Sequence, residues 1–199
     1  MFAVMALAHW HRFMVLTKRP ERMLEYISDL GAPGRIGKLV LQHGGLRGVS
    51  CASWPLLNVM GMVSAEDQAA ADERIPLLLA TPLVRRGVSL EPLLGPIKLR
   101  PEWLKGLNLV IAGGESGPAA RPSHPDWFRS LRDQCAAAGV EYHFKQWGKW
   151  APSNRMPGQE VAQAAGTWPA DAQPLARLGK KLAGRLLDGV EHNGTGWAP

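Results

Sequence analysis

The chain has 199 residues, of which 46% are hydrophobic and 20% are charged, and its formal net charge is +6. These values are ordinary for a soluble globular protein and allow one sizeable core. The two cysteines, Cys51 and Cys135, lie too far apart for a disulfide framework or a CxxC site, so we expect no metal site in this chain.

Residues 1–16 are mostly apolar and raise the question of an export signal. His9, His11 and Arg12 interrupt them, and they lack the basic start and the small-residue cleavage site of a signal peptide. A membrane span would need about 20 apolar residues. We therefore expect a cytoplasmic protein without a membrane span.

Five short apolar runs alternate with longer stretches of helical pattern. The helical stretches are residues 20–31, 67–81 and 124–139. Ser64 or Asp67 is expected as the N-cap of the second stretch, and Gly139 as the C-cap of the third. Strands separated by helices are typical of parallel βαβ units. The predicted strands, in chain order, are Phe13–Leu16, Asn58–Val63, Arg86–Leu90, Leu109–Ala112 and Val140–Phe144.

This alternation predicts an α/β fold in which residues 1–150 form a partial β/α barrel of about five parallel strands. A complete barrel has eight strands and about 250 residues, so the chain is interpreted as the C-terminal portion of a larger barrel. Between the first two strands, a short helix is expected around residues 36–43. Residues 151–199 are rich in glycine, proline and polar residues, which predicts an irregular C-terminal extension with a short basic helix.

Polar residues follow the strands at their carboxyl ends, where parallel α/β proteins bind ligands. Ser64 precedes Glu66 by two positions, and Ser89 precedes Glu91 in the same way, so each pair faces one side of its strand. Either serine could instead cap the helix that follows. The candidate ligand-binding residues are Lys18, Ser64, Glu66, Ser89, Glu91, Gly113, Gly114, Glu115, Ser116 and Lys145.

The fourth strand runs into "GGESG", where Gly113 and Gly114 would let the backbone approach a ligand and offer amides to a phosphate, carboxylate or ribose. The motif is neither a dinucleotide fingerprint nor a Walker loop. The alternative is a tight turn that needs no ligand. Glu115 is expected near Glu66 and Glu91, with the charges balanced by the lysines of the first and last strands or by a ligand's ammonium group.

The motifs "FMVLTKRPERM", "VSAEDQAAADERIPLLLATP", "VSLEPLLGPI", "LVIAGGESGPAARPSHPDWF" and "GKKLAGRLLDG" closely resemble the phage and prophage proteins typified by phage Gp37/Gp68. That family is a domain of unknown function related to the radical SAM barrels. The resemblance implies a radical-SAM-like TIM barrel in which the serines and glutamates at the strand ends contact cofactor or substrate. S-adenosylmethionine and a [4Fe–4S] cluster would be the cofactors of full-length members, held partly by an N-terminal three-cysteine segment. That segment is absent here, so the resemblance implies an N-terminally truncated member with no certain cofactor of its own.

The leading interpretation is therefore a fragment of a phage or prophage radical-SAM-like protein, of unestablished substrate and not catalytic alone. The sequence identifies no catalytic residue. The alternative is a non-catalytic module that binds a nucleotide or nucleic acid through the same strand ends and the basic segment "RLGKKLAGR". A prophage remnant without activity is a third interpretation.

Overall fold

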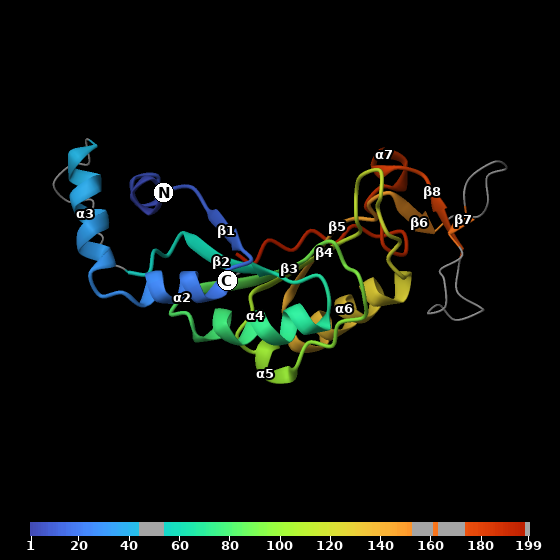
Figure 1. Cartoon of the computed structure of the whole chain (residues 1–199), viewed down its shortest axis with the longest axis horizontal. Coiled ribbons are helices and arrows are strands. Elements are labelled where there is room, and N and C mark those ends of the chain that lie inside the picture. The colour runs from blue at the N-terminus through green and yellow to red at the C-terminus, as the bar shows by residue number, and fades with distance from the viewer. Residues whose placement is uncertain (44–53, 153–160, 163–173, 198–199) are drawn as a thin grey trace.

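The computed structural model describes residues 1–43, 54–152, 161–162 and 174–197. Its main feature is a five-stranded parallel sheet in which the strands follow one another in chain order (Figure 1). The α/β fold and the partial β/α barrel predicted from the sequence are thereby confirmed. The strands are β1 (Phe13–Thr17), β2 (Val59–Ser64), β3 (Arg85–Leu90), β4 (Leu109–Gly113) and β5 (Glu141–Gln146).

The connecting helices lie on one face of the sheet, below it in Figure 1. They are α2 (Pro20–Ser28), α4 (Gln68–Ala80), α5 (Pro101–Leu104) and α6 (Pro125–Ala138). The residue that caps α4 is Asp67, whose carboxylate accepts a hydrogen bond from the Ala70 amide at 2.9 Å. Gly139 ends α6 in the left-handed conformation, with φ of 69°. These local signals place α2, α4 and α6 where the sequence predicted them, whereas the four-residue α5 was not predicted.

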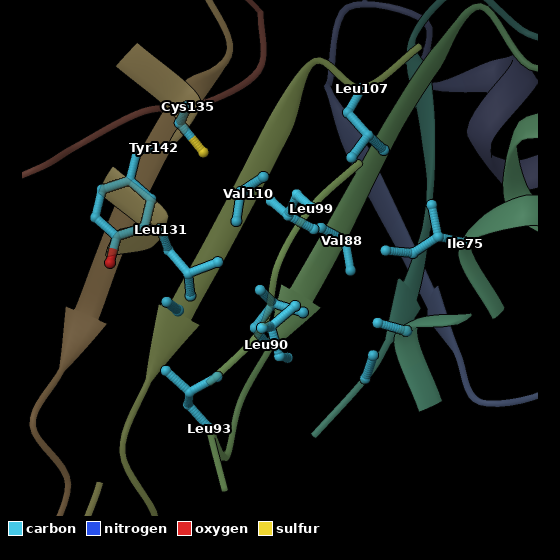
Figure 2. Close-up of a cluster of buried hydrophobic side chains, with 14 of the residues drawn as sticks. Ile75, Val88, Leu90, Leu93, Leu99, Leu107, Val110, Leu131, Cys135 and Tyr142 are labelled. Atoms are coloured by element: carbon cyan, nitrogen blue, oxygen red, sulfur yellow. The ribbon is translucent and has the colours of Figure 1, made fainter. Parts of the chain in front are cut away.

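Between this helical layer and the sheet lies the larger hydrophobic core. Alternate strand residues, among them Val88, Leu90 and Val110, point toward Ile75 of α4 and Leu131 of α6 (Figure 2). All five side chains are fully buried. Burial on this scale supplies the main free energy of folding, so the sheet and its helices form one cooperative unit.

The opposite face of the sheet, here called the inner face, carries the other alternate residues, including Met60, Met62 and Leu109. The C-terminal residues 192–194 pair with the outer edge of β5, and residues 195–197 continue onto this face at the strand beginnings. The Gly194 amide donates to the Tyr142 carbonyl at 3.0 Å, and Trp197 packs against the Met60 cluster. This segment therefore covers the amino ends of the strands and not their carboxyl ends.

Two further helices, α1 (Phe2–Leu7) and α3 (Ala32–Gln42), form a smaller cluster beside β1. The helix predicted around residues 36–43 is thus longer and begins earlier. Within the described residues β1 has only β2 as a sheet neighbour, so it forms an edge of the sheet. On this edge strand Met14 and Leu16 are 46% and 54% exposed.

The C-terminal extension is more regular than predicted. A second, antiparallel sheet has the order β6-β8-β7, and α7 (Lys180–Ala183) occupies the place of the predicted basic helix. Its strands are too short for hydrophobic periodicity to reveal them in the sequence. No described helix is long and apolar enough to cross a bilayer. The three strands are β6 (Trp150–Pro152), β7 (Val161–Ala162) and β8 (Leu175–Arg177).

Candidate functional site

The ten candidate residues lie at or just beyond the carboxyl ends of the five parallel strands, an edge here called the rim. Parallel pairing brings these ends together, although the residues come from segments far apart in the sequence. Two pairs of them are joined by ion pairs that connect the ends of different strands, Lys18 with Glu66 and Lys145 with Glu91. The rim is therefore a connected polar surface.

At the β1–β2 side of the rim, Glu66 binds two cations. The Lys18 ammonium lies 3.3 Å from both carboxylate oxygens, and the Arg74 guanidinium of α4 lies 3.1 Å from one of them. Partial burial raises the pKa of Glu66, but the hydrogen bonds and charge of Lys18, with the charge of Arg74, outweigh it and lower the pKa. Glu66 is thus ionised, and the expected Lys18 partner is confirmed. Arg74 was missed because nothing in its helical sequence distinguishes it from a surface arginine.

At the β3–β5 side, Glu91 is held by two side chains of the last strand. Lys145 donates to one carboxylate oxygen at 2.9 Å, and the Gln146 amide donates to the other at 3.2 Å. The same amide nitrogen lies 3.2 Å from the Ser116 hydroxyl. Gln146 therefore joins Glu91 to the loop after β4. Gln146 was not predicted from the sequence, although it directly follows the predicted Lys145.

Glu115 differs from the prediction, because Arg121 and not the lysines of the first and last strands neutralises it. The Arg121 guanidinium makes two hydrogen bonds of 2.8 Å to the carboxylate, and the Arg121 amide makes a third of the same length. The side-chain hydrogen bonds are the main reason that the pKa of Glu115 falls to about 2. The negative charge of Glu66 also helps to raise the pKa of Arg121. A short loop that folds back on itself decides this pairing, and the two-pronged guanidinium suits a carboxylate better than a lysine does.

Gly113, the last residue of β4, and Gly114, which follows it, are both required by close packing. A Cβ at Gly114 would overlap the Trp147 carbonyl oxygen and lie 2.6 Å from its carbon, and one at Gly113 would lie 3.2 Å from the Glu91 carboxyl carbon. The Gly114 amide donates to the Gln146 carbonyl at 2.9 Å. This amide is therefore paired within the fold, beside the chain that follows β5, and a ligand contact at Gly114 stays a prediction.

Ser64 and Ser89 end β2 and β3 and are neighbours in the parallel register. Alternation along both strands puts them on the inner face, beside Met62 and away from the helical core. Each is 5% exposed, and no other described side chain or backbone group forms a hydrogen bond with either hydroxyl. Neither hydroxyl oxygen is among the fully buried side-chain atoms that lack a partner, so both remain accessible to water or to a ligand at the rim. Neither caps a helix, because Asp67 caps α4 and the next helix, α5, begins at Pro101.

The described residues do not fit a [4Fe–4S] cluster. Cys135 is fully buried on the helical side of the sheet (Figure 2), where burial raises the pKa of its thiol to about 12. A cluster requires several thiolates close together, and a thiol of such high pKa is a poor ligand. Cys51 lies outside the described residues, and within them no group of three His, Cys, Asp or Glu side chains could hold a metal ion.

Comparison with known proteins gives a match to one family. A family model described as "Protein of unknown function (DUF5131)" matches residues 1–196. No curated protein and no solved structure matches the chain. The family match spans the five-stranded sheet and the C-terminal segment that crosses its inner face, so the two parts belong to one family domain.

Proposed function

We propose, for a chain that belongs to this family of proteins of unknown function (DUF5131), that the rim binds a zwitterionic nucleoside such as S-adenosylmethionine. The observation that carries the proposal is the pair of Ser64 and Ser89 hydroxyls on the inner face. The motifs that resemble the phage Gp37/Gp68 proteins support the same ligand, since those proteins are related to radical SAM barrels. On this proposal the chain is a phage or prophage protein of that kind, and binding is the function assigned to it.

The serine pair offers a ligand two adjacent hydroxyls that no described protein group occupies. A hydrogen bond between a ligand and such a group contributes about 0.5–1.5 kcal/mol net, because it replaces a hydrogen bond to water. A ligand whose own hydroxyl or carboxylate oxygens reach both Ser64 and Ser89 would gain this contribution at two adjacent positions. Ribose, with two neighbouring hydroxyls, presents the matching pair of donors and acceptors.

The ion pairs above the serines suit a ligand that carries both charges. At the rim the carboxylates are the more buried partners, with side-chain exposures of 18% for Glu91 and 25% for Glu66, whereas Lys145 and Lys18 are 52% and 58% exposed. The lysines can therefore move outward more easily than the carboxylates. A ligand ammonium group would then replace a lysine beside a glutamate, and the displaced lysine would bind the ligand carboxylate.

Bound S-adenosylmethionine would supply a sulfonium group with an activated carbon–sulfur bond. The residues of this chain hold and orient the ligand: Ser64 and Ser89 at its sugar, and the carboxylates and lysines of the rim at its amino-acid end. No cleavage step is assigned to them, because the described residues provide no cluster ligands.

The proposal is tested by calorimetric titration of the full chain with S-adenosylmethionine. In the Ser64→Ala/Ser89→Ala variant we expect at least tenfold weaker binding, which corresponds to about 1.4 kcal/mol or more. The melting temperature without ligand should stay the same or rise, because the hydroxyls removed have no partner. Ser28→Ala, at the exposed end of α2, is the matched control and should bind like the wild type.

Glu115→Gln provides a second test at the rim. The fold should tolerate it, and binding should weaken, because the amide is neutral and cannot hold a cation. If the serine variant melts lower while its affinity is unchanged, or if the wild type shows no binding, the rim is not a site for this ligand.

A further inference from the structure

Three lysines, Lys149, Lys180 and Lys181, lie next to the rim and form what is here called the lysine patch. The Lys149 amide donates to the Glu115 carbonyl at 2.9 Å, and the Lys149 carbonyl accepts from the Gly179 amide at 3.0 Å. Gly179 immediately precedes the other two lysines, which form the first turn of α7. Two backbone hydrogen bonds thus fix the patch to the loop that carries Glu115.

The lysines of the patch lack counter-charges, in contrast to several arginines elsewhere on the surface. On α6, Arg129 pairs with Asp126 and Asp188, and Arg132 pairs with Asp133 and Asp188. Arg100 pairs with Asp72. Within the part of the chain that the structure describes, no carboxylate lies within ion-pair distance of any lysine of the patch. These three charges are therefore available to an external anion.

Two further exposed cations lie at the rim itself. Arg121 and Lys145 have side chains that are 61% and 52% exposed, and each is paired with a rim carboxylate. The segments that carry the five cations extend from α7 to the ends of β4 and β5. Acidic residues along this path are limited, within the described residues, to glutamates that already have cationic partners.

We propose that this path binds the phosphate backbone of single-stranded nucleic acid and delivers one nucleoside of that strand to a position beside the ligand held at the rim. Only the delivery to the rim rests on the proposed function. The lysine patch would bind the phosphate backbone whether or not the rim holds a nucleoside. Lysine ammonium groups bind phosphates as point charges, and the net charge of +6 adds a favourable long-range field. A single strand fits because its bases can leave the stack without the cost of opening a duplex.

A membrane surface is the competing partner for a group of lysines beside exposed apolar residues. Leu182 and Leu186 near the patch are 75% and 51% exposed. However, α7 has only four residues, too few for an amphipathic helix that lies in a bilayer surface. The connection to the rim through Lys149 favours a polynucleotide, whose length would allow it to occupy both places.

The experiment measures fluorescence anisotropy of a labelled single-stranded oligonucleotide of mixed sequence, as DNA and as RNA, with the full chain at several salt concentrations. The three lysines of the patch, which have no carboxylate partner among the described residues, predict a slope of about −2.1 for log affinity against log salt, or about 20-fold loss between 50 and 200 mM. The variant Lys149→Ala/Lys180→Ala/Lys181→Ala removes these contacts, so its affinity should be weaker and should change little with salt over the same range.

The control variant is Lys38→Ala/Lys98→Ala/Lys105→Ala, whose three lysines are exposed and lie outside the path. It lowers the net charge by the same three units, from +6 to +3, and should bind oligonucleotide with the wild-type slope. If both variants lose affinity equally, only the overall charge matters and the patch is not a site. Binding to vesicles with anionic lipids, in place of oligonucleotide, would overturn the assignment in favour of a membrane.

Titration of the same variants with S-adenosylmethionine separates this inference from the proposed function. The patch variant should bind the free nucleoside like the wild type. If oligonucleotide binds through the patch but the nucleoside does not bind, the proposed function fails and the backbone path stands. If the nucleoside binds but the oligonucleotide does not bind through the patch, the backbone path is refuted and the proposed rim site stands.

Discussion

Gly114 provides the sharpest test of how the rim is built, through the substitution Gly114→Ala. The added methyl would overlap the Trp147 carbonyl oxygen and lie 2.6 Å from its carbon. Both neighbours are backbone atoms, so no side-chain rotation can make room. The two loops must separate instead, and the Gly114–Gln146 hydrogen bond, which joins them at 2.9 Å, would be lengthened or broken.

The size of the effect follows from these two contributions. Forcing a methyl group into filled space costs about 1–3 kcal/mol, and losing a backbone hydrogen bond costs about 1 kcal/mol. We therefore expect the free energy of unfolding to fall by about 3 kcal/mol. For a chain of this size that corresponds to a melting temperature lower by about 6–12 °C.

Differential scanning calorimetry of the variant and a matched control would measure this difference. Gly95→Ala is that control, because its Cβ would meet nothing within 4 Å and its backbone angle is not in the left-handed region. We expect the control to melt within about 2 °C of the wild type. Equal melting of Gly114→Ala and Gly95→Ala would refute the packing explanation for the glycine pair.

Two further predictions concern an ion pair and the C-terminal segment. The pKa of Glu115 is about 2 in the folded protein and 4.5 ordinarily, so its stabilising contribution is complete above about pH 4.5 and is lost as the pH falls toward 2. The shift corresponds to about 3 kcal/mol at most, and the 61% exposure of Arg121 reduces it to about 1 kcal/mol. Urea unfolding at about pH 6 and about pH 3 should therefore show a smaller acid-induced loss in Glu115→Gln than in the wild type, and equal losses would contradict the assignment. Trp197→Ala should lower the free energy of unfolding by about 1–3 kcal/mol, because it uncovers Met60 and Leu109. The control Trp10→Ala, at a 70% exposed position, should change that free energy by less than about 0.5 kcal/mol. A Trp197→Ala protein as stable as Trp10→Ala would show that the C-terminal segment is not part of the fold.

The sequence by itself determined the five strands, the three longer connecting helices and the parallel order of the strands. These depend on local information: apolar runs of strand length, Pro20 at a helix start, Gly139 at a helix end. It also determined which residues meet at the rim. Once strands are parallel, their carboxyl ends share one edge, and the period of two places Ser64 with Glu66 and Ser89 with Glu91.

Only the tertiary structure decided how the rim residues pair. Lys18 and Lys145 were predicted as cations of the rim, but the choice of Arg121 for Glu115 depends on the path of a loop that no periodicity encodes. Arg74 enters because the helix after β2 returns along the sheet and presents that position to Glu66.

The roles of the glycine pair and of the C-terminal segment were also decided by the tertiary structure. "GGESG" is compatible with a ligand loop or with a tight turn, and the position of the Trp147 carbonyl against Gly114 decides for packing. The strands of the second sheet are only two or three residues long, so they depend on partners distant in sequence and carry no local signal. Local patterns fix which elements form, whereas side-chain partners are fixed by which segments the completed fold brings within hydrogen-bond distance.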